Sequence, residues 1–349
     1  MIAIIAVLTL IFIIGTIFGS FINVVILRSL SEESIVFPAS KCPKCQTPLK
    51  WYHNIPVLSY LFLRGKCAFC NEKISIQYPI VELLTGLIFL GTTMFYFHSC
   101  IEWGFIDGYN FNNISLWLFT LAVSCLYIII AGTDIKSLVV YELHTYIIMG
   151  ISLLFGLVKS IYTGSWYILL YTIAGAVIFY LFVLGLKIFF DKLLKTEAIG
   201  DGDPFIAGAI GSVIGAVLPP ETSFVLLLLA ILIIFMLSPL VYAVWAVPLY
   251  LYNLYMQKNY YLMSILIAFL AYALTYVFAY NVGWLGNSIA QISSFCVAVA
   301  LGLWVCFELL RNLRRNQASI CAQIPLGPAL VLTAFVMMFV ISANSGYIF

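Results

Sequence analysis

Residues 1–28, MIAIIAVLTLIFIIGTIFGSFINVVILR, contain no charged side chain before Arg28. An α-helix needs about 20 apolar residues to cross about 30 Å of hydrocarbon, so this stretch is long enough to span a membrane. A secretory signal peptide has a positively charged start and a shorter apolar segment, and residues 1–28 have neither feature. We therefore expect these residues to form a first, retained transmembrane helix.

The composition of the whole chain extends this expectation. Hydrophobic residues make up 64% of the 349 residues and charged residues only 9%. A soluble protein carries about 25% charged residues because its surface must be hydrated. The composition excludes a soluble enzyme, a disulfide-rich secreted scaffold and a disordered chain, and the uninterrupted apolar runs argue against a β-barrel. The net charge of +2 says little about partners, and we expect no nucleic-acid partner.

Apolar runs follow one another along the rest of the chain. They lie near residues 79–98, 114–133, 139–160, 166–189, 204–218, 222–256, 261–280, 288–309 and 325–343. Most approach the length needed to cross a bilayer. We predict an all-α polytopic membrane protein of about ten transmembrane helices, with residues 222–256 as one tilted span that has Pro239 and Pro248 near its end.

The positions of the basic residues predict the orientation of these helices. If the N-terminus lies outside, threading ten spans places every lysine and arginine on the cytosolic side except Lys159. Basic residues concentrate in the cytosolic loops of membrane proteins. The polar loop at residues 29–78 is therefore expected in the cytosol.

That loop contains two cysteine pairs, Cys42-Pro-Lys-Cys45 and Cys67-Ala-Phe-Cys70, separated by 21 residues. Two such pairs allow four thiolates to converge on one tetrahedral zinc ion. A loop of this size has little hydrophobic core, so a metal would supply stability that it lacks. We expect a small zinc-binding domain with four cysteine ligands over residues 29–78. Redox-active or free thiols are the alternative, and His53 is a further candidate ligand.

Aspartates stand at the cytosolic ends of two predicted helices. Asp134 follows the run at 114–133, and Asp201 and Asp203 precede the run at 204–218. An aspartate inside a bilayer costs about 2.5–3.5 kcal/mol, so such residues usually face a protein interior or a wet cavity. Asp203-Pro204 also has the pattern of a helix N-cap followed by proline at the first helical position. The functional alternative is an aspartyl dyad, in which one carboxyl group holds a proton while the other acts as a base.

These motifs together resemble those of the type 4 prepilin peptidases, a family of membrane leader peptidases and N-methyltransferases. The resemblance rests on seven features: GSFINVVILR at 19–28, the two cysteine pairs, WYHNIPVLS at 51–59, IQYPIVE at 76–82, Asp134, the Gly-x-Gly-Asp motif ending in Asp203, and IPLGP at 324–328. It therefore runs nearly from one end of the chain to the other.

The resemblance implies a GxGD-type aspartyl membrane protease in the bacterial inner membrane. Such an enzyme removes the basic leader of type IV prepilins or type II secretion pseudopilins at the cytosolic face, and then methylates the new N-terminus with S-adenosylmethionine. The implied partners are a prepilin or pseudopilin substrate with a basic leader and an apolar helix, and the lipid bilayer. The catalytic residues would be Asp134 and Asp203, within a core of residues 79–349. The resemblance implies zinc ligands at Cys42, Cys45, Cys67 and Cys70.

The chain departs from the family pattern at several positions. Val140-Tyr141 stands where the family usually has Ile-Pro, and Phe205 stands where it usually has lysine. Loss of that lysine, together with the added charge of Asp201, should let the dyad hold its proton to higher pH. These departures leave two alternatives open: a catalytically inactive scaffold that binds prepilins, and a transporter that uses the aspartates for proton or cation coupling.

Overall fold

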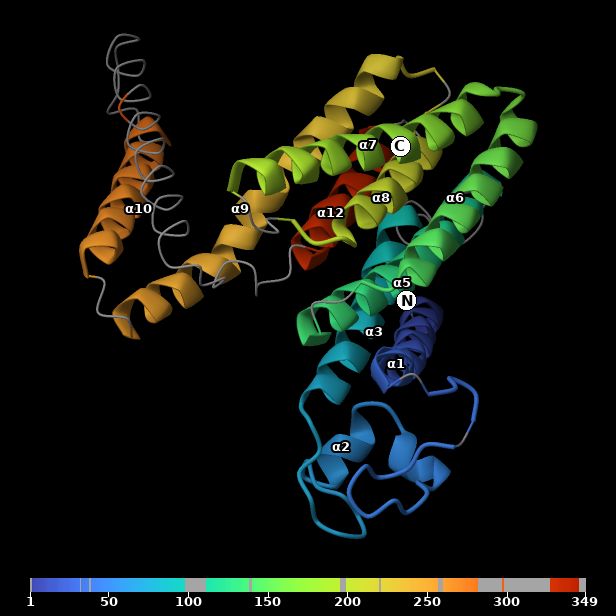
Figure 1. The fold of residues 1–349 in the computed structure, drawn as a ribbon. Coiled ribbons are helices and arrows are strands. Elements are labelled where there is room, and N and C mark those ends of the chain that lie inside the picture. Colours follow the sequence, from blue (N-terminus) through green and yellow to red (C-terminus); the bar gives the residue numbers. More distant parts are fainter. Residues whose placement is uncertain are drawn as a thin grey trace. The chain divides into compact units, whose positions relative to one another are not determined.

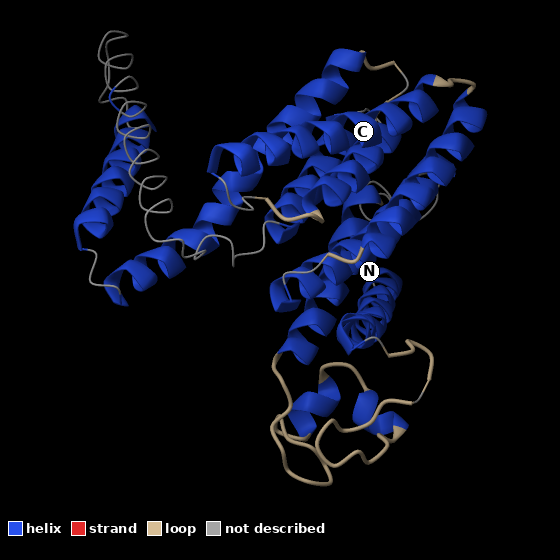
Figure 2. Ribbon diagram, in the orientation of Figure 1, coloured by secondary structure: helices blue, strands red, loops and turns tan. Residues whose placement is uncertain are grey.

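Helices joined by loops make up the described part of this computed structural model (Figures 1 and 2). The structure describes residues 2–31, 33–37, 39–97, 111–137, 140–194, 199–219, 221–256, 260–281, 297 and 327–344. The helices are α1 (Ile2–Ser31), α2 (Leu58–Phe62), α3 (Gln77–Tyr96), α5 (Phe111–Ser137), α6 (Glu142–Thr163), α7 (Tyr167–Leu194), α8 (Asp203–Val217), α9 (Phe224–Met256), α10 (Tyr260–Asn281) and α12 (Gly327–Asn344), with a 3-10 turn, η1 (Trp51–Asn54).

The prediction of an all-α polytopic membrane protein is confirmed. Each predicted span that falls on described residues coincides with one helix, and residues 222–256 form the single helix α9. The predicted span at 288–309 lies outside the described residues. Among the described helices, α1, α3, α5, α6 and α7 are long and apolar enough to cross a membrane by length and composition.

The chain divides into two compact units. The first consists of Met1–Phe189, Ile199–Pro239 and Pro325–Phe349, and the second of Phe190–Ala198 and Leu240–Ile324. The cysteine loop and the candidate aspartates all belong to the first unit, so the site can be described within it.

Helices α1 and α3 are antiparallel and joined by the cysteine loop (Figure 1). Glycines in α1 permit the close approach, since a Cβ at Gly19 would lie 2.6 Å from the Cα of Glu82. The Asn23 amide donates a 3.1 Å hydrogen bond to the carbonyl of Tyr78, where α3 begins. Near the end of α1, Ile26 packs on Gly132 of α5. The C-terminal end of α5 therefore lies at the same end of the bundle as the cysteine loop.

Helix α8 is the buried centre of the first unit, since every residue in it except Phe205 is buried. Two glycines let α7 approach α8 closely, because a Cβ at Gly211 or Gly215 would collide with a carbonyl of α7, at Gly175 or Tyr171. Small residues let the backbones of membrane helices meet in this way. With 15 residues, α8 is about 22 Å long, which is shorter than the hydrocarbon layer.

The contacts of Lys159 explain why this basic residue stands apart from the others, on the side predicted to lie outside the cytosol. Its side chain is only 3% exposed, and its ammonium donates hydrogen bonds of 3.2–3.3 Å to the carbonyls of Ala216, Val217 and Leu218. The last carbonyls of a helix lack partners within the helix and carry partial negative charge. Lys159 therefore stabilises the C-terminal end of α8 from α6.

Candidate functional site

The two cysteine pairs form two turns of the same design, KCPKCQTP at 41–48 and KCAFCNEK at 66–73. In the first turn, the Cys42 N–H donates to the carbonyl of Thr47 and the Gln46 N–H donates to the carbonyl of Cys42. Cys67, Glu72 and Asn71 make the equivalent bonds in the second turn. The residue after each pair has a left-handed backbone, with φ of 56° at Gln46 and 58° at Asn71. Local sequence thus folds each pair in the same way.

These turns bring the four sulfurs together. The Sγ atoms of Cys42, Cys45, Cys67 and Cys70 all lie within 4.8 Å of one another. Sulfurs bound about 2.3 Å from a tetrahedral zinc ion stand about 3.8 Å apart, and the Sγ atoms of Cys42 and Cys70 are 3.9 Å apart. The sulfurs therefore lie close enough together to bind one metal ion.

Hydrogen bonds within the turns favour the metal-binding thiolate form of Cys45 and Cys67, whereas burial and the neighbouring thiols raise the pKa of Cys70 to about 11. The side chain and backbone of Thr47 lower the pKa of Cys45 to about 6, and the backbone N–H groups of Cys70 and Phe69 lower the pKa of Cys67. The thiolate is the ligand form of cysteine. His53 is not part of the cysteine group, and its ring packs against Phe69 with centroids 5.3 Å apart.

The loop is fixed to the helices by a buried glutamate. Glu82 of α3 is 7% exposed and accepts a 2.7 Å hydrogen bond from the backbone N–H of Val57. This bond joins two of the motifs in which the sequence resembles known peptidases. Between the loop and the end of α1 lies a cavity of about 800 Å³, and Lys136 of α5 also lines it.

Asp134 lies in the last turn of α5 and is 4% exposed. Its Oδ2 accepts a 3.1 Å hydrogen bond from the N–H of Gly327, the first residue of α12. The N-terminal N–H groups of a helix carry partial positive charge and bind anions. A Cβ at Gly327 would collide with that same Oδ2. Only glycine at position 327 thus lets α12 approach the carboxyl group so closely.

Asp203 begins α8 and is 7% exposed. The N-cap of α8 is Gly202, and Asp203 Oδ2 accepts a 3.1 Å hydrogen bond from the N–H of Gly200, outside the helix. The alternative interpretation of Asp203 as the N-cap of α8 is therefore wrong. Val140, at a position where the chain departs from the family pattern, packs directly on Gly202.

The fold brings these two acids to one place. Asp134 and Asp203 come from different helices, both are buried, and Gly327 of α12 lies against the carboxyl group of Asp134. Ile206, one turn into α8, also borders the position of Gly327. Two carboxyl groups in such an arrangement ionise one at a time, because two buried like charges repel.

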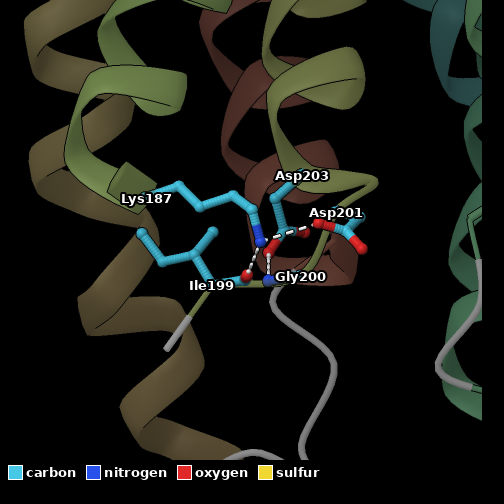
Figure 3. Close-up of polar contacts among 5 residues, drawn as sticks. All are labelled: Lys187, Ile199, Gly200, Asp201 and Asp203. Carbon is cyan, nitrogen blue, oxygen red and sulfur yellow. Dashed lines mark hydrogen bonds and ion pairs between the residues drawn. The ribbon is translucent and has the colours of Figure 1, made fainter. Parts of the chain in front are cut away.

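Lys187 changes the expectation for Asp201. Its Nζ lies 2.8 Å from Asp201 Oδ1, so the negative charge of Asp201 is paired rather than added to that of the dyad. Figure 3 shows the ammonium of Lys187 pointing from α7 toward the loop at Ile199 and Asp201. The sequence did not indicate this pairing, because the lysine on α7 is distant in sequence from the motif. The expectation on proton retention stays a prediction.

Two residues of the site, Gly327 and Lys187, were not identified from the sequence. Gly327 stands inside the IPLGP motif, which marked the segment but not its contact with Asp134. Nothing around Lys187 in the sequence indicates a role. Phe205 packs with its ring centroid 5.9 Å from that of Tyr146 and 5.4 Å from that of Tyr180, so an aromatic cluster occupies the place of the expected lysine.

Comparison with known proteins identifies the N-terminal part of the chain. Residues 13–96, which cover most of α1, the cysteine loop and α3, match the Bacterial Peptidase A24 N-terminal domain. No solved structure matches the chain.

Relatives named prepilin leader peptidase/N-methyltransferase match a longer part of the chain. One from Klebsiella pneumoniae is 32% identical over 60% of this chain and 86% of its own length. One from Vibrio cholerae is 33% identical over 60% of this chain and 78% of its own length. A relative from Myxococcus xanthus is 32% identical over 58% of this chain, but the chain spans only 54% of that protein. With such identity across most of the Klebsiella and Vibrio relatives, the chain belongs to the prepilin leader peptidase/N-methyltransferase family.

Proposed function

We propose that the protein is an aspartyl endopeptidase that removes the basic leader of type IV prepilins or type II secretion pseudopilins. The observation that carries the proposal is the meeting of two buried aspartates, Asp134 and Asp203, from separate helices at one end of the bundle. Burying carboxyl groups beside each other is costly, and such pairs serve hydrolysis in aspartic proteases.

The chemistry follows from one shared proton. The ionised carboxyl group takes a proton from water, and the water oxygen forms a bond to the scissile carbonyl carbon. The protonated carboxyl group donates to the carbonyl oxygen, and the C–N bond then breaks as the leaving amine receives a proton. The Gly327 N–H and the Gly200 N–H hold one oxygen of each carboxyl group, which fixes the direction of both side chains.

The four cysteines are proposed as ligands of a structural zinc ion. Four sulfur ligands complete a tetrahedral shell and leave no position for water, so the ion would hold the loop in shape rather than take part in hydrolysis. We retain residues 1–28, 29–78 and 79–349 as first helix, zinc-binding loop and peptidase core. The positive-inside distribution supports a position in the bacterial inner membrane, with the loop and the aspartates at the cytosolic face.

Methylation of the new N-terminus by S-adenosylmethionine is proposed from the family. When bound, this donor supplies a methyl group to the amine. The cavity of about 800 Å³ beneath the cysteine loop is within the size range of small-molecule sites, and charged side chains including Lys41, Glu72 and Lys73 line it together with apolar residues of α1. These groups fit a donor that carries both a carboxylate and an ammonium.

Mass spectrometry of a co-expressed prepilin tests the peptidase. We expect the wild-type protein to remove the leader, and Asp134→Asn and Asp203→Asn each to reduce cleavage by at least about a thousandfold, because general acid–base catalysis contributes up to about 10⁴. Glu221→Gln, a change at an exposed glutamate between α8 and α9, is the matched control and should cleave normally.

Other outcomes would favour the alternatives. An intact prepilin that still co-purifies with the wild-type protein would indicate an inactive scaffold. Substrate-driven ion flux in proteoliposomes, lost in Asp203→Asn, would indicate a transporter. The same mass spectrum reports methylation, because a methylated N-terminus is about 14 daltons heavier.

A further inference from the structure

The loop that carries Asp203 is held from a neighbouring helix. Lys187 lies about two turns before the end of α7, and its Nζ donates a 2.8 Å hydrogen bond to the carbonyl of Ile199. The same Nζ lies 2.8 Å from Asp201 Oδ1 (Figure 3). The Lys187 side chain is only 14% exposed. An ammonium group largely withdrawn from water needs acceptors, and it finds both of these in the loop.

Two further hydrogen bonds lie within this loop. Gly200 N–H donates to Asp203 Oδ2 at 3.1 Å, and Asp203 N–H donates to the carbonyl of Gly200 at 3.2 Å. These bonds shape the turn and couple the Asp203 carboxyl group to the backbone of Gly200. They do not fix the turn to α7, whereas Lys187 does, at the residue directly before Gly200.

We propose that Lys187 is a positioning residue for leader cleavage, which holds the turn Ile199–Asp203 so that the Asp203 carboxyl group faces Asp134. This inference rests on the proposed function. Lys187 lies outside the motifs that the family resemblance uses, and its partner Asp201 occupies the variable position of the Gly-x-Gly-Asp motif. The positive charge beside this turn therefore comes from Lys187 on α7. At position 205, where the family usually has lysine, this chain has Phe205.

The two contacts of Lys187 should contribute unequally to holding the turn. Asp201 is 88% exposed, and an ion pair with so exposed a partner contributes little because water screens it. The carbonyl of Ile199 is part of the backbone that leads to Asp203. The hydrogen bond to Ile199 is therefore expected to matter more than the ion pair.

Cleavage kinetics of the detergent-solubilised full chain test the role of Lys187 and the ranking of its two contacts. For Lys187→Met we expect kcat to fall about tenfold to hundredfold with KM unchanged, because displacing a catalytic group by about 1 Å has effects of this size. Lys187→Arg retains a donor and should restore most of the rate, and Asp201→Asn should lose less than about fivefold. Lys192→Met, which removes an exposed lysine of the same helix, is the control and should leave kcat unchanged. Equal kcat for Lys187→Met and wild type, or a change in KM alone, would overturn the proposal.

Hydrogen exchange gives a readout that needs no substrate. In Lys187→Met the backbone amides of Gly200 and Asp203 should exchange faster than in wild type, while peptides from α1 and α3 exchange at unchanged rates. Unchanged exchange at residues 199–203 would show that Lys187 does not hold the turn. If the wild-type chain cleaves no prepilin, the proposed function fails and the catalytic part of this inference fails with it, while faster exchange would still establish that Lys187 holds the turn.

Discussion

The cysteine loop and the aspartate site are built in opposite ways. The four candidate metal ligands lie within 29 residues, from Cys42 to Cys70, in two turns of the same design. The aspartate site takes Asp134 from α5, Asp203 from α8, Gly327 from α12 and Lys187 from α7. The loop is therefore a local structure, whereas the site exists only where four helices meet.

Because the two regions are built differently, they should be sensitive to different substitutions. A change in one cysteine turn alters a small unit whose ends are held by α1 and α3. A change at any helix contact of the aspartate site moves a carboxyl group that must stand in one direction. Local disorder in one part of a protein need not spread to another. The two regions should therefore fail separately.

Among the variants that separate the two regions, Gly327→Ala should have the largest effect on cleavage. The added Cβ would collide with Asp134 Oδ2, so the carboxyl group must turn away and lose the hydrogen bond from α12. We expect cleavage to fall about a hundredfold, the effect of a misplaced catalytic group, while the metal content of the purified protein stays at the wild-type value. Gly150→Ala is the matched control, because no atom lies within 4 Å of a Cβ there. Equal cleavage by the two variants would refute the role assigned to Gly327.

The double substitution of Cys42 and Cys67 by serine should have the opposite effect, with loss of the metal and retention of cleavage. Elemental analysis should then find no bound zinc, against one ion per wild-type chain, because structural zinc requires its full set of thiolates. Limited proteolysis should cut the loop faster, while prepilin cleavage persists at a reduced rate. Cys125→Ser, which changes a cysteine in α5 outside the loop, should keep the metal. A wild-type protein without zinc would remove this prediction altogether.

The smallest effect concerns position 205. Phe205→Lys adds a positive charge near the dyad, which favours the ionised carboxylate, so the acidic limb of the pH–rate profile should move to lower pH. We expect a shift of less than about one pH unit, because Lys187 already supplies one positive charge beside the turn and the new side chain must leave the contacts with Tyr146 and Tyr180. Phe205→Met keeps an apolar side chain and should leave the limb in place. A limb that moves upward in Phe205→Lys would contradict the charge argument.

Much of this protein was predictable from its sequence, because the relevant signals are local. Hydropathy measures the transfer of each residue into lipid, so it located the helices, including the single long helix α9. The spacing of the cysteines predicted a cluster because each pair folds by hydrogen bonds among its own neighbours. The catalytic role of Asp134 and Asp203 stays a prediction.

Only the tertiary structure decided what surrounds the aspartates. The N–H of Gly327 reaches Asp134 across 193 residues of sequence, and Lys187 reaches Asp201 from another helix. Hydropathy does not determine which helices pack together, because it measures the transfer of each helix into lipid and not its fit to a neighbour. That choice depends on shape, such as the contact of Gly211 in α8 with Gly175 in α7. A charge such as that of Asp201 can be judged only when its spatial neighbours are known.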